Sequence, residues 1–221
     1  MLEIGGWRFV RLALVRLFVA VEPGESVRST AADAAREFQR RLGTTLRARW
    51  VAPEKMHLTV RFIGHVDDTR VDALLDALRP ALPVAAFDLE TGTCGVFPPS
   101  GPPRALWLGL SAGVASLAAM HDEFDSRLGP LGYEPEDRPF NVHLTLARVK
   151  DAPRGSAAIV REAVRTIVPA HARSRITHAT VFQSVPSPNG SSYRPLVTVE
   201  CLKRGTRSEE RGTSGEGRVD K

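Results

Sequence analysis

The chain has 221 residues, which is enough for one or two domains with a sizeable hydrophobic core. Hydrophobic residues make up 43% and charged residues 25%, average values that exclude a disordered, collagenous or membrane-embedded protein. The formal net charge is +5, but residues 15–202 hold 22 basic against 20 acidic residues. Composition alone therefore does not identify a nucleic-acid-binding protein.

The N-terminal region does not predict a membrane segment or a signal peptide. Residues 10–21 are nearly all apolar, but Arg11 and Arg16 interrupt them, and no apolar stretch of 18 residues occurs anywhere. The two cysteines, Cys94 and Cys201, make no disulfide framework. We therefore expect a protein of the reducing cytoplasm.

The first half of the chain alternates strand and helix patterns. A strand over 15–21 ends at Pro23 and Gly24, and a helix over about 25–42 has Gly43 as its stop. The remaining elements of this half are strands at 46–51 and 57–63, a helix from Asp67 to Pro80, and strands at 86–97 and 104–110.

The second half repeats this order, with helices at about 113–128 and 156–168 and strands from His143, at 173–184 and at 192–201. The motif HLT begins at His57 and again 86 residues later at His143, and the same offset relates the helices of the two halves. The spacing thus predicts a duplicated strand and helix unit. Because several strands follow each other across turns too short for a crossover, we expect an α+β protein with antiparallel pairing.

We divide the chain into a single bilobal domain over 15–202, an N-terminal extension over 1–14 and a disordered tail over 203–221. The tail lacks aromatic residues and has little that could be buried.

The chemistry of the site is predicted by the paired HLT motifs. On a strand, residues i and i+2 share a face, so each motif directs one imidazole and one hydroxyl the same way, from His57 and Thr59 and from His143 and Thr145. Two imidazoles can divide acid and base roles at a phosphoryl centre, while hydroxyls donate to its nonbridging oxygens.

An arginine could hold the charge that develops on the phosphate. Arg61 shares the face of His57 if its strand is regular, whereas Arg148 shares that of His143 only past a bulge or a strand end. A third H-x-T, at His178, has no equivalent at the 86-residue offset, so we expect an exposed or edge histidine there.

A metal site is the alternative reading of the histidines. His65, Asp67 and Asp68 follow His57 closely, but no second cluster completes the three or four ligands that zinc takes. We therefore expect no metal and no cofactor.

Longer blocks of the sequence resemble a known family. The blocks are RLFVAV at 16–21, RWVAPEKMHLTVRFIG at 49–64, GVFPPSGPPRALWLGL at 95–110, RPFNVHLTLAR at 138–148 and SVPSPNGSSYRPL at 184–196. The chain is similar in these blocks to the two-histidine (2H) phosphoesterase superfamily. Within it, the chain resembles the RNA 2′,3′-cyclic phosphodiesterases, historically called 2′-5′ RNA ligases.

The resemblance implies a bilobal duplicated α+β fold, with two antiparallel sheets facing a central cleft and helices on the outside. It implies metal-independent hydrolysis of a terminal 2′,3′-cyclic phosphate to a 2′-phosphomonoester. His57 would then be the proton donor and His143 the proton acceptor, and Thr59 and Thr145 would bind the phosphate. The resemblance also favours Arg148 over Arg61 and suggests Phe18 as a base-stacking wall.

Two other functions remain open at this point. One is reversible 2′-5′ ligation of RNA ends, and the other is a module that binds RNA ends or nucleotides without turnover. The paired histidines argue against the second, since binding alone does not require two titrating groups. We expect a monomer acting on RNA with 2′,3′-cyclic phosphate ends or on small cyclic nucleotides, without a membrane partner.

Overall fold

The computed structural model describes residues 14–136, 139–187 and 191–202. The expected tail at 203–221 and the expected extension at 1–14, except for Leu14, lie outside the described residues. The helices are α1 (Glu25–Leu42), α2 (Val71–Leu78), α3 (Val114–Leu128) and α4 (Ser156–Thr166). The strands are β1 (Leu14–Val21), β2 (Arg47–Trp50), β3 (Leu58–Asp67), β4 (Leu82–Ala85), β5 (Phe87–Phe97), β6 (Ala105–Ala112), β7 (Leu144–Asp151), β8 (Arg173–Ile176), β9 (His178–Val185) and β10 (Ser192–Leu202).

The strands form one continuous path in the order β4-β10-β9-β1-β3-β7-β6-β5-β8, with β2 also paired to β7. Its central part is β9-β1-β3-β7-β6-β5. In this part β3 corresponds to β7, β1 to β6 and β9 to β5, so the order of strands is the same when it is followed from either end. The expected α+β duplication is thus visible as a pseudo-twofold arrangement. Every pairing is antiparallel except that of β4 with β10.

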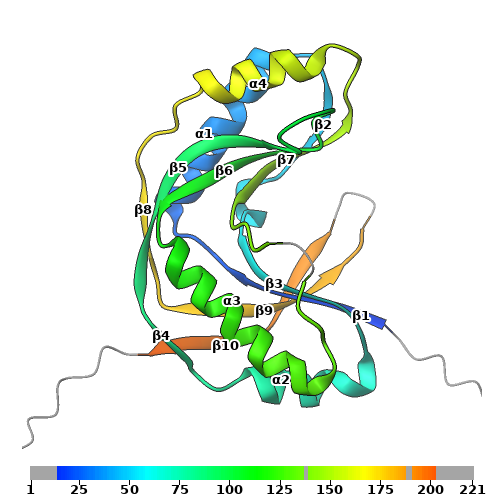
Figure 1. The fold of residues 1–221 in the computed structure, drawn as a ribbon, viewed down its shortest axis with the longest axis vertical. Coiled ribbons are helices and arrows are strands. Elements are labelled where there is room, and N and C mark those ends of the chain that lie inside the picture. Colours follow the sequence, from blue (N-terminus) through cyan, green and yellow to red (C-terminus); the bar gives the residue numbers. More distant parts are fainter. Residues whose placement is uncertain (1–13, 137–138, 188–190, 203–221) are drawn as a thin grey trace, which may run out of the picture.

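The pseudo-twofold junction is the contact between β3 and β7, where Leu58 is paired with Leu144. These two residues are separated by the same 86 positions as the two histidines that precede them. The two sheets expected from the sequence are therefore joined at this one point into a single strongly bent path (Figure 1). The junction brings His57 and His143 into the same region of the fold.

The helices pack in two pairs, one at each end of the path. Helices α1 and α4 lie against strands of the β5–β8 end, and α2 and α3 lie against β3, β4 and β10 (Figure 1). Helix α1 follows β1 in the chain yet packs on β7, while α3 follows β6 yet packs on β3. Each lobe is therefore built from both halves of the sequence.

The core of the β5–β8 lobe shows why the helices form where they do. In α1, Val27, Ala31, Ala35, Phe38 and Leu42 recur at helical spacing, and all are buried.

None of the described helices is long and apolar enough to cross a membrane. Within the described residues both cysteines are free and buried.

Candidate active site

A cleft of about 530 Å³ opens at the junction of the two lobes. It collects His57, Thr59, His143, Thr145 and Arg148, which the sequence placed in the site. The other residues that line it are Arg16, Phe18, Val51, Lys55, Met56, Phe62, Phe97, Ala105, Ser184, Ser191 and Tyr193. Among the described residues the lining therefore carries three cationic side chains and no carboxylate, so the cleft suits an anion.

The two histidines are held by the same kind of hydrogen bond. His57 Nδ1 lies 2.9 Å from the carbonyl oxygen of Lys55, and His143 Nδ1 lies 2.7 Å from that of Asn141, in each case two residues earlier in the chain. Because a carbonyl only accepts, each Nδ1 carries the proton and donates it. In both rings Nε2 has no partner among the described residues and is left for a substrate in the cleft.

Burial lowers the pKa of both imidazoles, and the hydrogen bonds to the backbone carbonyls oppose this shift. The positive charge of Arg148 lowers the pKa of His57 and of His143 further, and His143 itself lowers that of His57. One guanidinium therefore acts on both rings, as expected if all three groups face a common phosphate.

Thr59 and Thr145 occupy equivalent positions, two residues after each histidine, and both are half-buried in the cleft lining. Neither hydroxyl has a hydrogen-bond partner within the part of the chain that the structure describes. Both are therefore available to donate to nonbridging phosphate oxygens.

Each motif strand has a β-bulge directly after its threonine. On β3, Thr59 is paired with Ala20 and Arg61 with Val19, so Val60 is one extra residue. On β7, Leu146 is the extra residue, again 86 positions later. A bulge reverses which face the following side chains take.

The expectation that Arg61 shares the face of His57 is wrong because of this bulge. Arg61 is 3% exposed and does not line the cleft. Its guanidinium forms an ion pair with Asp125 and donates to the carbonyl oxygens of Phe62 and Glu134. Arg61 is a structural residue beneath the cleft.

The residue five positions after each histidine returns to the cleft past the bulge. On β7 this residue is Arg148, as the sequence allowed, and on β3 it is Phe62. In the described residues the Arg148 guanidinium has no ion-pair or hydrogen-bond partner. The cleft is thus charged on the β7 side and aromatic on the β3 side at symmetric positions.

Phe18 reaches the cleft, but it does not present a face for a base. Its ring is 4% exposed and lies 5.1 to 5.4 Å from the rings of His57, Phe182 and Tyr193. Phe18 therefore supports the His57 ring. Phe62, whose ring centroid lies 6.2 Å from that of Phe18, is 43% exposed, whereas the cleft residues Phe97 and Tyr193 are half-buried.

The wall behind His143 is made by Phe97, at 5.0 Å between ring centroids, and Trp107, at 6.1 Å. Trp107 lies flat against Gly95, where a Cβ atom would fall 2.0 Å from the indole ring. This close approach requires a glycine at that position.

Replacing Gly95 with Ala should destabilise the fold by about 1–3 kcal/mol, because the indole cannot move without disturbing the wall of His143. Urea unfolding measures this effect. Gly129→Ala is the matched control, since its φ is −52° and a Cβ there would meet nothing within 4 Å. Equal stability of the two variants would contradict the packing argument.

His178 lies outside the cleft, with its Nδ1 3.0 Å from the hydroxyl oxygen of Thr177. It is half-buried at the start of β9, which lies between β10 and β1, so the expectation of an exposed or edge histidine is wrong. In the described ranges no three His, Cys, Asp or Glu side chains gather in a way that could hold a metal ion.

Several cleft residues were not predicted from the sequence, among them Arg16, Lys55, Phe62 and Tyr193. Arg16 and Tyr193 do lie within the blocks that resemble the known family, and Lys55 and Phe62 lie in the block around His57. No local pattern singles these residues out, because their place depends on strand pairing across long sequence separations.

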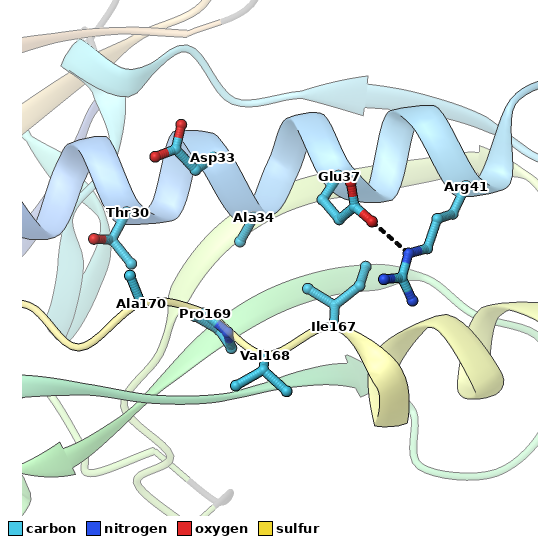
Figure 2. Close-up of a pocket in the computed structure, with 9 residues that line it drawn as sticks. All are labelled: Thr30, Asp33, Ala34, Glu37, Arg41, Ile167, Val168, Pro169 and Ala170. Carbon is cyan, nitrogen blue, oxygen red and sulfur yellow. Dashed lines mark hydrogen bonds and ion pairs between the residues drawn. The ribbon is translucent and has the colours of Figure 1, made fainter.

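A second hollow, of about 260 Å³, lies between α1 and residues 167–170 (Figure 2). It shares no lining residue with the cleft. Glu37 is its central carboxylate, and hydrogen bonds from Arg40 and Arg41 lower the Glu37 pKa to about 2. A carboxylate held in its ionised form in this way is no general acid, so we assign no catalytic role to this hollow.

The fold and the cleft define a class of protein in which two pseudo-symmetric lobes bring paired histidines together over one anion site. The model of the family described as LigT-like phosphoesterases matches this chain twice, over residues 26–107 and 108–193. The chain belongs to the LigT-like phosphoesterase family. The double match also confirms the duplication expected from the sequence.

Individual relatives support this placement. The chain is 31% identical to an RNA 2′,3′-cyclic phosphodiesterase of Aeropyrum pernix over 70% of this chain and 87% of that one. It is 27% identical to the protein of that name from Archaeoglobus fulgidus, over 84% and 100%. Among solved structures, TT0787 of Thermus thermophilus matches with a TM-score of 0.66 at 23% identity, over 86% of this chain and 100% of that chain. Escherichia coli LigT complexed with 3′-AMP matches with 0.63 at 20% identity, over 86% and 99%, which shows a shared fold.

Proposed function

We propose that the protein hydrolyses the 2′,3′-cyclic phosphodiester at the end of an RNA chain to a 2′-phosphomonoester, without a metal ion. The observation that carries the proposal is the pair of imidazoles, each fixed through Nδ1 and free at Nε2, in a cleft whose described lining is cationic and holds no carboxylate. The names of the relatives from Aeropyrum pernix and Archaeoglobus fulgidus support the choice of RNA cyclic phosphate as substrate.

In the proposed reaction, His143 Nε2 takes a proton from water as the water oxygen bonds to phosphorus. The bond between phosphorus and the 3′ oxygen breaks, and protonated His57 gives its Nε2 proton to that oxygen. The phosphate stays on the 2′ oxygen. Thr59 and Thr145 donate hydrogen bonds to the nonbridging oxygens, and Arg148 balances the charge that develops on them.

The proposal is tested by incubating the purified protein in EDTA with a short RNA that ends in a 2′,3′-cyclic phosphate. Chromatography then separates 2′-phosphate from 3′-phosphate products. We expect a 2′-phosphate at a rate that EDTA does not change. A 3′-phosphate would reverse the proposed geometry, and RNA binding without turnover would show a binding module.

The pH dependence of kcat/KM should report both histidines as a bell-shaped profile, since one ring must be neutral and the other protonated. Burial and Arg148 lower both pKa values from the ordinary 6.5, so we expect the optimum below pH 6.5. Removing the charge of Arg148 raises both pKa values. Arg148→Gln should therefore move the optimum to higher pH.

Arg148→Gln should also lower kcat/KM by about 10- to 100-fold, because a hydrogen bond to a charged oxygen is lost. Arg36→Gln, on the exposed face of α1, is the control and should change neither quantity. A lowered rate with an unmoved optimum would contradict the electrostatic role of Arg148.

A further inference from the structure

A groove of about 710 Å³ continues from the cleft on the side of His143. The groove and the cleft share four lining residues, Thr59, Phe62, Phe97 and His143. Among the other described residues that line it are Pro98, Pro99, Pro102 and Phe140 and the charged Arg104 and Glu136.

The cleft and the groove are each large enough for a ligand of their own. Binding sites for small ligands span about 300–1,000 Å³, and the cleft and the groove each fall within that range. The cleft alone has room for the terminal ribose and its cyclic phosphate. The groove is therefore available to a second part of the substrate.

Phe62 lines both the cleft and the groove, and its backbone is held by two hydrogen bonds. Its backbone N–H donates to Glu136 Oε1 at 3.1 Å, and its carbonyl oxygen accepts from Arg61 Nη1 at 2.5 Å. Arg61 is itself anchored on Asp125. A large apolar side chain that is 43% exposed and fixed on both sides of its backbone forms a rigid platform for a flat ring.

The charges of the groove favour a polyanion. Arg104 lines it and its guanidinium has no ion-pair or hydrogen-bond partner among the residues described. The carboxylate of the groove, Glu136, is engaged with the Phe62 amide and lies 3.7 Å from Arg61. The part of the groove that the structure describes therefore offers one free cation next to aromatic and proline surfaces, a combination that suits single-stranded nucleic acid.

The pseudo-symmetry of the fold also supports an aromatic binding surface at Phe62. Phe62 takes the position on β3 that Arg148 takes on β7. The two copies of the duplicated unit therefore differ at the one cleft position past the bulge, with a cation on one side and an aromatic ring on the other. The paired histidines and threonines are the same on both sides of the cleft, so this difference is what distinguishes one side from the other for a bound substrate.

We infer that the groove is a subsite for the nucleotide that precedes the terminal one in a single-stranded RNA, with its base stacked on Phe62 and its phosphate near Arg104. The inference rests on the proposed function and adds a substrate preference to it. An RNA with at least two nucleotides should be processed better than a mononucleotide, because the mononucleotide leaves the groove empty.

The test compares kcat/KM for a dinucleotide with a 2′,3′-cyclic phosphate and for adenosine 2′,3′-cyclic phosphate. We expect a preference of about tenfold or more for the dinucleotide in the wild type, as stacking on one aromatic ring supplies. Phe62→Ala should bring the ratio close to one, Phe62→Trp should keep it, and Arg104→Gln should reduce it and weaken its salt dependence. Ile159→Ala, at an exposed site on α4, is the control and should leave both rates unchanged.

The same comparison is made by calorimetry with the 2′-phosphate products, which requires no turnover. Turnover of both substrates with no preference, or a Phe62→Ala variant that loses both to the same extent, would overturn the subsite. If the wild type turns over neither substrate, the proposed function fails. In that case the calorimetry still tests the subsite. If the wild type binds the dinucleotide product more tightly than the mononucleotide product, and Phe62→Ala removes this difference, the subsite is supported. Equal binding of the two products by the wild type would exclude it.

Discussion

His143→Ala and His57→Ala should each lower kcat by about 10²- to 10⁴-fold, the range that general acid–base catalysis contributes. Each ring offers a free Nε2 to the cleft, and the described cleft lining holds no third histidine. Initial rates on an RNA with a 2′,3′-cyclic phosphate measure the loss. The double variant should be little worse than either single variant, because the two groups act in one step.

Two further variants separate catalysis from folding. His57 packs against Phe18 and Tyr193, so an Ala there also leaves a cavity. An Asn at either histidine position keeps a donor for the backbone carbonyl and should be as inactive as the Ala variant with a smaller loss of stability. His178→Ala alters the third H-x-T outside the cleft and should keep wild-type rates. Residual activity above one tenth in a folded His143→Asn variant would argue against a catalytic role for that ring.

Asp125→Ala should destabilise the fold by about 3–5 kcal/mol, because it leaves the buried Arg61 without its main anionic partner. Asp125 Oδ2 also lies 3.3 Å from His121 Nε2, and His121 Nδ1 lies 2.8 Å from the carbonyl oxygen of Val60 in the bulge. Losing this carboxylate therefore loosens the strand segment that carries Thr59. Urea unfolding measures the change in the free energy of unfolding.

An exposed ion pair gives the control for this effect. Asp33→Ala removes the partner of Arg36 on the surface of α1 and should change stability by less than about 1 kcal/mol. A double variant, Arg61→Met with Asp125→Leu, should recover much of the loss, since it removes the buried charge altogether. Similar stabilities for Asp125→Ala and Asp33→Ala would contradict the structural role of Arg61.

Local patterns in the sequence were sufficient for most of the fold. The apolar spacing of α1 and the Gly and Pro stops predicted its bounds, and the 86-residue offset predicted the duplication. The short strand β4 was missed because its four residues hold a proline and pair with the distant β10. The exchange of α1 and α3 between the lobes was also not predictable, since it depends on contacts between separate halves of the chain.

The site residues could be predicted where their placement depends only on neighbouring residues of the same strand. The two histidines and two threonines need only the two-residue period of a strand, and the structure brings them together. Arg61 was placed wrongly because a bulge after Thr59 reverses the following faces, and no residue in the sequence marks that bulge. Phe18 was misjudged because its burial depends on Phe182 and Tyr193, which arrive from the far end of the chain.

In the proposed reaction two symmetric histidines do different work, with His57 as the acid and His143 as the base. A 2′,3′-cyclic substrate in which sulfur replaces the 3′ oxygen tells these two roles apart. A thiol is far more acidic than an alcohol, so the leaving sulfur departs without a proton. We expect His57→Asn to recover most of its lost turnover on this substrate, whereas His143→Asn should stay inactive. Recovery by His143→Asn, or by neither variant, would contradict the assignment.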